Sequence, residues 1–172
     1  MRKLKYYVAA SVDSFIARAD GSVDWQERGG KEDYGMKEFY ATLDTVLIGR
    51  KTHDFMVSMK MESYPKVTNY VFSRSKPGGK HGKVEFISQD ASAFVADLKK
   101  RPGKDIWLVG GSLLAQELFQ HRLVDEIAVH FCPVLLGEGI PLFQGPYPES
   151  NLQLLSCKAY ASGFVGITYS VK

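Results

Sequence analysis

The sequence is poor in cysteine, has no long apolar run, and carries no strong excess of one charge. Its two cysteines, Cys132 and Cys157, form no CxxC pair and have no histidine or cysteine at zinc-ligand spacing. We therefore expect no disulfide framework and no metal site, and a reducing, cytoplasmic compartment. No run approaches the roughly 18 apolar residues that span a bilayer, so no membrane partner is expected.

The charge balance gives no indication of a nucleic-acid partner. Lys and Arg number 22 against 19 Asp and Glu, a net charge of +3 that is scattered along the chain, so no nucleic-acid partner is expected. The apolar fraction of 45% and charged fraction of 24% are average for a globular protein. There is no internal repeat or domain linker, and residues 1–172 are expected to form one domain.

Apolar patterning predicts strands that alternate with helices. A first strand is expected over Leu4–Val12, and Met36, Phe39, Tyr40 and Leu43 fall on one face of a helix. Three short, unbroken apolar runs follow along the chain, and such runs are typical of parallel strands covered on both faces. They occupy Thr45–Gly49, Asn69–Ser73 and Asp105–Val109, with helices predicted from Arg50, around Phe94–Leu98 with Asp90 or Ser92 as the cap, and after Gly111.

The pattern changes near the C-terminus. A strand is expected over Glu126–Phe131, a loop rich in glycine and proline over Pro133–Phe143, and a closing hairpin that turns at Ser162-Gly163. Parallel strands at the front and an antiparallel hairpin at the end predict an α/β domain with a mixed sheet.

Two strand-to-helix turns have the composition of an anion site. Gly49 precedes Arg50, Lys51 and Thr52, and Gly110-Gly111 precede a helix that starts at Ser112. The first N–H groups of a helix point outward without partners and attract phosphate, and glycine lets the anion approach the backbone. The alternative for either turn alone is that glycine only allows close packing of helix on sheet.

A third strand ends in the hydroxyl-rich and cationic segment Ser73–Lys76. The alternatives here are a solvated loop and a clamp for an extra phosphate, such as the 2′-phosphate of NADP. Ligands of open α/β sheets bind where parallel strands end, so the three strand ends together favour a phosphorylated dinucleotide.

With these motifs, the chain resembles the dihydrofolate reductase superfamily, and within it the reductase domain of the bifunctional riboflavin-biosynthesis protein. The segments that carry the resemblance are Val8–Asp13, Asp20-Gly21 with Trp25, Val46–Thr52, Val109–Gly111 and Val134–Phe143. The last of these is typical of the riboflavin branch. That branch usually has glycine where this chain has Ser14, a difference that affects the loop beside the nicotinamide if the position needs a positive φ.

The resemblance implies an NADPH-dependent reductase on a three-layer fold, with a mixed, mainly parallel sheet of eight strands. By matched position, Gly49, Arg50, Lys51 and Thr52 would hold nucleotide phosphates, and Ser73 and Arg74 would contact the 2′-phosphate region. Gly110, Gly111, Ser112, Leu113 and Leu114 would hold the pyrophosphate, and Ala10, Ile16, Asp20 and Gly21 would flank the nicotinamide. The resemblance also implies a homodimer, and the apolar segment Ile127–Leu136 is compatible with an interface or a buried edge.

The catalytic group is the open question at this stage. Counted back from Gly49, Asp33 lies where dihydrofolate reductases keep the carboxylate that binds the pterin. The alternative is that Asp33 charges the first turn of the next helix. We expect His130 to be a satisfied core or interface residue, His53 to be exposed, and Trp107 to belong to the core. Tyr6 and Tyr7 must face opposite sides of their strand, so that one of them can reach a pocket.

Three functions remain open. The first is reduction of a small heterocycle, for which the nearest named activity is that of 5-amino-6-(5-phosphoribosylamino)uracil reductase. The second is a nucleotide-binding module without turnover. The third is a true dihydrofolate reductase, which the segment Gly137–Phe143 disfavours.

Overall fold

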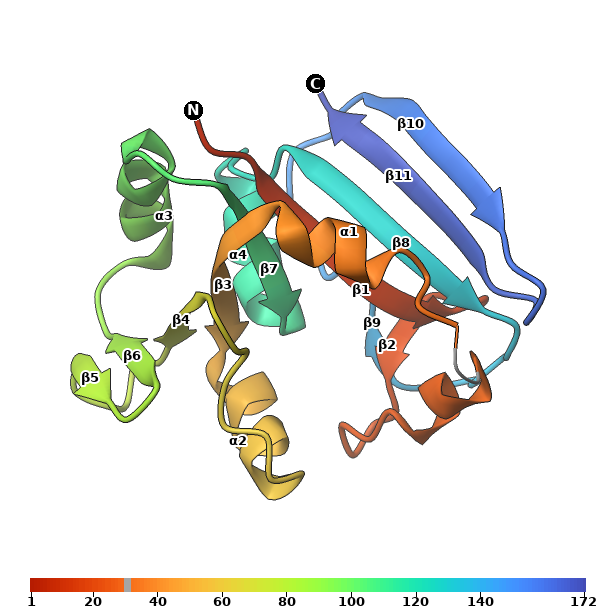
Figure 1. The fold of residues 1–172 in the computed structure, drawn as a ribbon, viewed down its shortest axis with the longest axis horizontal. Helices are drawn as coiled ribbons and strands as arrows, with labels where there is room; N and C mark the ends of the chain where they lie inside the picture. The colour runs from red at the N-terminus through yellow and green to blue at the C-terminus, as the bar shows by residue number, and fades with distance from the viewer. Residues whose placement is uncertain (30–31) are drawn as a thin grey trace.

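The computed structural model describes residues 1–29 and 32–172, and Figure 1 shows how its helices and strands are arranged. The elements are β1 (Leu4–Ser11), β2 (Phe15–Ala17), the 3₁₀ helix η1 (Asp24–Gly29), α1 (Met36–Ala41), β3 (Leu43–Gly49), α2 (Arg50–Ser58), β4 (Thr68–Phe72), β5 (Gly79–His81), β6 (Val84–Ile87), α3 (Ala91–Lys100), β7 (Asp105–Gly110), α4 (Ser112–Gln120), β8 (Glu126–Cys132), β9 (Ile140–Pro141), β10 (Leu152–Ala159) and β11 (Val165–Val171).

Within the described residues, nine strands form one sheet in the order β10-β11-β8-β1-β7-β3-β4-β6-β5. The pairs from β8 through to β6 are parallel. The pairs β10–β11, β11–β8 and β5–β6 are antiparallel, which confirms the mixed, mainly parallel sheet with a C-terminal hairpin. The sheet has one strand more than the eight expected.

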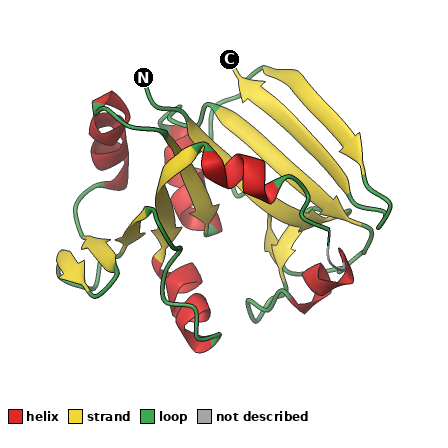
Figure 2. Ribbon diagram, in the orientation of Figure 1, coloured by secondary structure: helices red, strands yellow, loops and turns green. Residues whose placement is uncertain are grey.

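Helices cover both faces of this sheet, as the colouring of Figure 2 makes visible. One core cluster packs α3 and α4 against the sheet, and it includes Leu98, Leu118 and Leu4. A second cluster lies on the other face, where Met56 of α2 packs near Val46 and Trp107 and the partly buried side chains of α1 join them. The three layers of the expected fold are therefore present.

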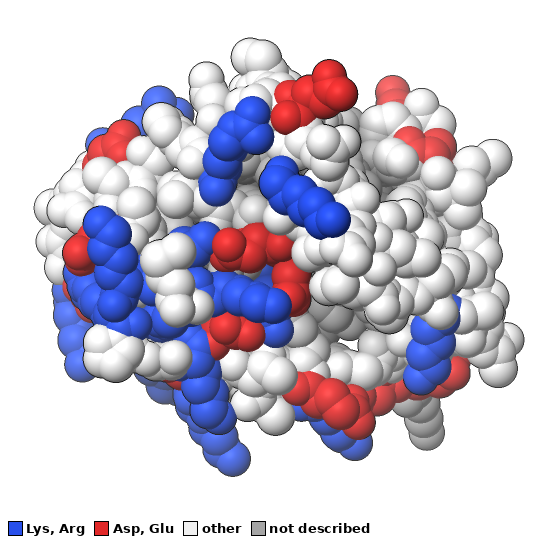
Figure 3. Space-filling view, turned by 90° about the horizontal axis from the view of Figure 1, so that it is seen from above, with Lys and Arg blue, Asp and Glu red and all other residues white. Residues whose placement is uncertain are grey.

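The edge of the sheet at the amino ends of the parallel strands is held by ion pairs. Nζ of Lys3 lies 2.6 Å from Glu126, and Nζ of Lys5 lies 2.8 Å from Asp105. Figure 3, which views the molecule from above, shows acidic and basic side chains interspersed on this end. The charges there largely pair with one another, so this end has no strong field of one sign.

Several predicted elements are confirmed and some details are wrong. The side chain of Asp90 caps α3 by accepting a hydrogen bond from the N–H of Ala93 at 2.7 Å. Leu43 was expected on a helix face, but α1 ends at Ala41 and Leu43 begins β3. Part of the loop expected between β4 and α3 forms β5 and β6 instead. A second small sheet pairs β2 with β9.

Two further expectations change once the strand order is known. Ile127 and Val129 lie on β8, which is an interior strand between β1 and β11, so their apolar character is explained by the core. His53 is buried, not exposed, because α2 places it edge-on against Phe86 at 5.5 Å between ring centroids. Among the described residues, no helix is long and apolar enough to cross a membrane.

Candidate functional site

A large cleft of about 2230 Å³ runs along the edge of the sheet where the parallel strands end. In Figure 1 the parallel strands end at the lower edge of the sheet, where α2 and β2 also lie. The ends of β1, β3, β4, β6 and β7 all contribute to its wall. Ligands of open α/β sheets bind at this end of the strands, so the fold itself marks the cleft as the candidate site.

The cleft brings together every site residue predicted from the sequence except Ala10. Ala10 is fully buried in the core beneath α3 and α4. Since neighbouring residues of a strand point to opposite faces, Ala9 lines the cleft in its place. The predicted residues that line the cleft are Ile16, Asp20, Gly21, Asp33, Gly49, Arg50, Lys51, Thr52, Ser73, Arg74, Gly110, Gly111, Ser112, Leu113 and Leu114.

The helices α2 and α4 both begin at the cleft without a side-chain cap. Gly49 and Gly111 occupy the N-cap positions, and neither helix has an acidic residue in its first turn. The first N–H groups of each helix consequently have no intrahelical acceptor. Both helices have nine residues, enough for an aligned dipole whose positive end faces the cleft.

The two helix starts lie against each other because glycine occupies both turns. A Cβ added to Gly49 would lie 2.8 Å from the backbone nitrogen of Gly111, closer than real side chains approach. A Cβ added to Gly111 would lie 3.1 Å from Oγ1 of Thr52. Glycine here allows close packing, as the alternative interpretation held, and that packing also joins two anion-attracting helix ends in one wall.

The end of β4 adds a cation to the same cleft. Ser73 is buried, and its Oγ accepts a hydrogen bond from the N–H of Lys76 at 3.2 Å. Arg74 is exposed and, within the part of the chain that the structure describes, forms no ion pair with a carboxylate. Arg50 differs, because its Nε lies 2.7 Å from Asp54. Arg74 is therefore available to an anionic ligand, as is the exposed Lys51 at the start of α2, for which the described residues likewise provide no ion pair.

The opposite wall is a loop that Asp13 holds in place. Its carboxylate accepts hydrogen bonds from the N–H groups of Leu136 and Gly137, the latter at 2.7 Å. The hydroxyl of Ser11, followed by these N–H groups, lowers the pKa of Asp13 below its usual range. Ser14 has a φ of +65°, so the position does need the conformation that glycine favours.

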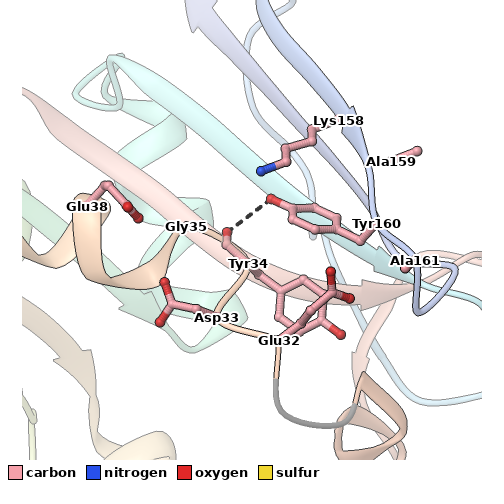
Figure 4. A pocket seen from close by; sticks show the side chains of 9 residues that line it. All are labelled: Glu32, Asp33, Tyr34, Gly35, Glu38, Lys158, Ala159, Tyr160 and Ala161. Atoms are coloured by element: carbon pink, nitrogen blue, oxygen red, sulfur yellow. Dashed lines mark hydrogen bonds between the residues drawn. The ribbon is translucent and has the colours of Figure 1, made fainter.

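Asp33 has a structural bond as well as a place in the cleft. Its Oδ2 accepts a hydrogen bond from the N–H of Lys37 at 3.1 Å, at the start of α1. Asp33 also borders a smaller pocket of about 590 Å³, shown in Figure 4, together with Glu38 and Tyr160. Among the residues described, no group of three or more histidine, cysteine or acidic side chains is arranged to hold a metal ion.

An aromatic floor completes the cleft, and sequence reasoning found only part of it. Tyr7 lines the cleft while Tyr6 points into the opposite core, as alternation along the strand predicts. Trp107 also lines the cleft, and its Nε1 donates to the carbonyl of Tyr7 at 2.9 Å. His130 and Phe164 come from the C-terminal part of the chain, and no local motif marks either residue.

The comparisons with known proteins agree with this geometry. A family model described as the RibD C-terminal domain matches residues 2–166. The chain is 39% identical to the Bacillus subtilis protein YwjB over 161 residues, which is 92% of each protein. It is 34% identical to YyaP of the same bacterium, covering 98% of this chain and 94% of that one. The chain therefore belongs to the RibD C-terminal domain family.

Solved structures show the fold. A protein from Shewanella sp. PV-4 has a TM-score of 0.87 at 24% identity, with 100% of this chain and 99% of that chain covered. The Thermotoga maritima deaminase and 5-amino-6-(5-phosphoribosylamino)uracil reductase has a TM-score of 0.74 at 14% identity, and this chain covers 57% of it. Dihydrofolate reductase from Enterococcus faecalis, complexed with NADP(H), has a TM-score of 0.67 at 16% identity over 96% of its length. The fold is that of dihydrofolate reductase.

Proposed function

We propose that the protein is an NADPH-dependent reductase that transfers a hydride to a small heterocyclic substrate. One observation carries the proposal: two uncapped helix N-termini and the unpaired Arg74 line one cleft. A pyrophosphate suits the paired helix ends, because their N–H groups and dipoles attract negative charge. A separate guanidinium suits a further phosphate on the ribose of adenosine.

The residues of the cleft divide the work of holding this cofactor. Gly49–Thr52 and Gly110–Leu114, which line the cleft, would hold the nucleotide phosphates through backbone N–H groups, and Ser73 and Arg74 would contact the 2′-phosphate. The segment that carries Ile16, Asp20 and Gly21 would flank the nicotinamide, which would supply the hydride when bound. The protein contributes orientation and a wall of aromatic side chains that keeps water away from the reacting atoms.

The substrate we propose is an aminouracil or a ring close to it. The Thermotoga maritima protein of the same fold is a 5-amino-6-(5-phosphoribosylamino)uracil reductase, which makes that compound the first one to try. Asp33 is the catalytic-site carboxylate in this proposal. Because its Oδ2 is bonded to the backbone of Lys37, its Oδ1 would accept from a ring N–H of the substrate.

A thermal-shift titration with NADPH and NADH in parallel tests the cofactor. At about 100 times its Kd, a ligand stabilises the native state by roughly 2.7 kcal/mol, which raises the Tm of a domain this size by about 5–10 °C. We expect NADPH to give this shift, NADH to give much less, and Arg74→Ala to remove the difference. Arg101→Ala, which alters an exposed arginine at the C-cap of α3 outside the cleft, is the control.

The outcomes separate the candidate functions. If neither nucleotide raises the Tm, the reductase proposal is wrong. If NADPH binds but no aminouracil, pterin or flavin oxidises it, the protein is a nucleotide-binding module without turnover. Turnover of dihydrofolate, with a kcat on the order of 1–10³ per second, would instead identify a dihydrofolate reductase.

A further inference from the structure

His130 is a buried titratable group that the proposed function leaves without a role. It lies on β8, lines the cleft, and only 8% of its surface is exposed. Its ring lies 4.9 Å from that of Tyr7 and 5.8 Å from that of Tyr160, tilted by 35° and 33°. The imidazole is therefore fixed between two aromatic rings and does not sample open solvent.

The two ring nitrogens of His130 differ in their surroundings. Nδ1 is sealed from solvent and has no hydrogen-bond partner among the described residues. Nε2 lies over Gly166, where an added Cβ would come within 3.2 Å of it. A proton on Nδ1 would be a buried donor without an acceptor, so the proton of the neutral ring belongs on Nε2. Burial lowers the pKa of His130, so the neutral ring is the form present at neutral pH.

The neighbouring tyrosines have already used their hydrogen-bond donors. The hydroxyl of Tyr7 donates to the carbonyl of Tyr34 at 3.3 Å, and the hydroxyl of Tyr160 donates to the same carbonyl at 3.1 Å. Figure 4 shows the second of these bonds from the side of the smaller pocket. Burial raises the pKa of both tyrosines, which keeps these hydroxyls protonated. Nε2 of His130, unlike Nδ1, is not a sealed atom without a partner, so among the described rings next to His130 its N–H is a donor left for a bound molecule.

We propose that His130 recognises the substrate by donating a hydrogen bond from Nε2 to an exocyclic oxygen of a flat heterocycle. The inference rests on the proposed function, because it places the heterocyclic substrate at the end of the cleft that Tyr7 and Trp107 line. The side chains there provide flat surfaces for stacking, one N–H donor on His130 and one carboxylate on Asp33. A ring that carries both C=O and N–H groups, as uracil does, satisfies both, whereas a ring without an oxygen leaves the donor unpaired.

The test follows the imidazole itself. Protein labelled with ¹⁵N in histidine is saturated with NADP⁺ and titrated with 5-amino-6-(5-phosphoribosylamino)uracil, while the ring nitrogens are observed by NMR. His130→Phe identifies the His130 signals by their loss. We expect the Nε2–H tautomer in the free protein and a change in the Nε2–H signal as the aminouracil binds. The signal of His53, which is also buried with Nδ1 unpartnered but lies outside the cleft, should stay in place.

Steady-state kinetics with NADPH provide the second readout. Losing one neutral hydrogen bond raises KM for the aminouracil about 10-fold in His130→Phe, with a smaller change in kcat. His130→Asn keeps a side-chain N–H and should recover part of this loss. His53→Phe is the matched control and should have the KM of the wild type.

Failure of this inference and failure of the reductase proposal give different results. If NADPH is oxidised but His130→Phe keeps the wild-type KM and the His130 signal does not move, the role of His130 is wrong and the reductase proposal survives. If the aminouracil moves the His130 signal but NADPH is not oxidised, recognition by His130 stands and the reductase proposal falls. An aminouracil that neither moves the signal nor is reduced overturns both the role of His130 and the choice of an aminouracil as substrate, whereas the reductase proposal itself is decided by the NADPH titration and by the pterin and flavin assays.

Discussion

Ser14 has a strained backbone conformation in the loop that forms one wall of the cleft. Its φ of +65° lies in the left-handed region, which is unfavourable for a residue that has a Cβ. The loop keeps it there, since its carbonyl accepts the N–H of Leu142 at 2.8 Å and Asp13 holds the backbone of Leu136 and Gly137. The surrounding hydrogen bonds thus impose a conformation that serine itself disfavours.

Replacing Ser14 by glycine should therefore stabilise the protein. We expect Ser14→Gly to raise the free energy of unfolding by about 0.5–1 kcal/mol, because relief of the strained φ outweighs the greater entropy of the unfolded chain. Urea denaturation, with the midpoint compared at constant m-value, measures the change. Ser14→Ala keeps a Cβ and is the control without a gain. Equal stability of the glycine and alanine variants would show that the conformation stores no strain.

The site residues that can be predicted from the sequence are those whose motif consists of neighbouring residues in the chain. Gly49 and Gly110-Gly111 were found because a strand, a glycine and a helix start are adjacent along the chain. The sequence predicts a satisfied core or interface residue at His130, whereas in the assembled sheet its Nδ1 has no hydrogen-bond partner among the described residues. The rings around it come from β1 and from segments far away in sequence, so no spacing reveals them.

At the scale of elements, the starts of α2, α3 and α4 all line the same cleft, but their N–H groups are satisfied in different ways. The start of α3 is satisfied by the side chain of Asp90, whereas α2 and α4 begin at Gly49 and Gly111 with their N–H groups uncapped. With glycine at the N-cap, a helix start is less stable by roughly a few tenths of a kcal/mol than one with a good side-chain cap. Of these three helices, the two that lack a side-chain cap are the pair that lie together, as an anion site requires.

The contact between the two turns can be tested by adding one methyl group. In Gly49→Ala the Cβ would lie 2.8 Å from the backbone nitrogen of Gly111, so β3 and the start of α4 must move apart. We expect a loss of about 1–3 kcal/mol in the free energy of unfolding. We also expect a smaller stabilisation by NADPH, measured as the difference in Tm with and without the nucleotide.

Gly145→Ala is the matched control for this variant. Its Cβ would lie 3.9 Å from the ring of Tyr147, an ordinary contact, and Gly145 is not part of the cleft wall. If Gly49→Ala loses stability but keeps the full response to NADPH, the close approach of the helices serves packing alone.

Long elements were predictable from the sequence, and short ones were not. The runs that became β3, β4 and β7 are apolar because helices cover both faces of the sheet there, a pattern that is visible without any partner. β2 and β9 have three and two residues, and they exist only because they pair with each other. β5 is fully exposed, so it has no apolar pattern to detect.

At the scale of the whole molecule, the strand order determines which apolar surface is left uncovered. The segment Ile127–Leu136 is apolar in sequence, but most of it belongs to the interior strand β8. The outer strand of the hairpin, β10, is exposed along its whole length and lies at the right-hand edge of Figure 1. Its leucines Leu152, Leu154 and Leu155 are 47%, 55% and 52% exposed. An exposed apolar edge strand normally has a partner or a protecting charge.

We expect a second copy of the chain to cover β10 in a two-fold symmetric dimer. The patch of leucines carries no charge, so it can face its own copy without repulsion, and a two-fold axis brings identical surfaces together. Leu154→Lys places a charge in each half of such an interface. It should raise the Kd of the dimer about 100-fold or more, which sedimentation velocity at micromolar concentration detects.

Two variants decide where the interface lies. Leu135→Lys alters an exposed leucine of the apolar segment Ile127–Leu136, and Met59→Lys alters an exposed residue after α2. With the dimer on β10, both of these proteins sediment as the wild type does and only Leu154→Lys becomes a monomer. Dissociation by Leu135→Lys with no effect of Leu154→Lys would move the interface to the loop after β8. A wild-type chain that is monomeric at micromolar concentration would mean that β10 is exposed in solution, and its three leucines would then favour association with other exposed strand edges.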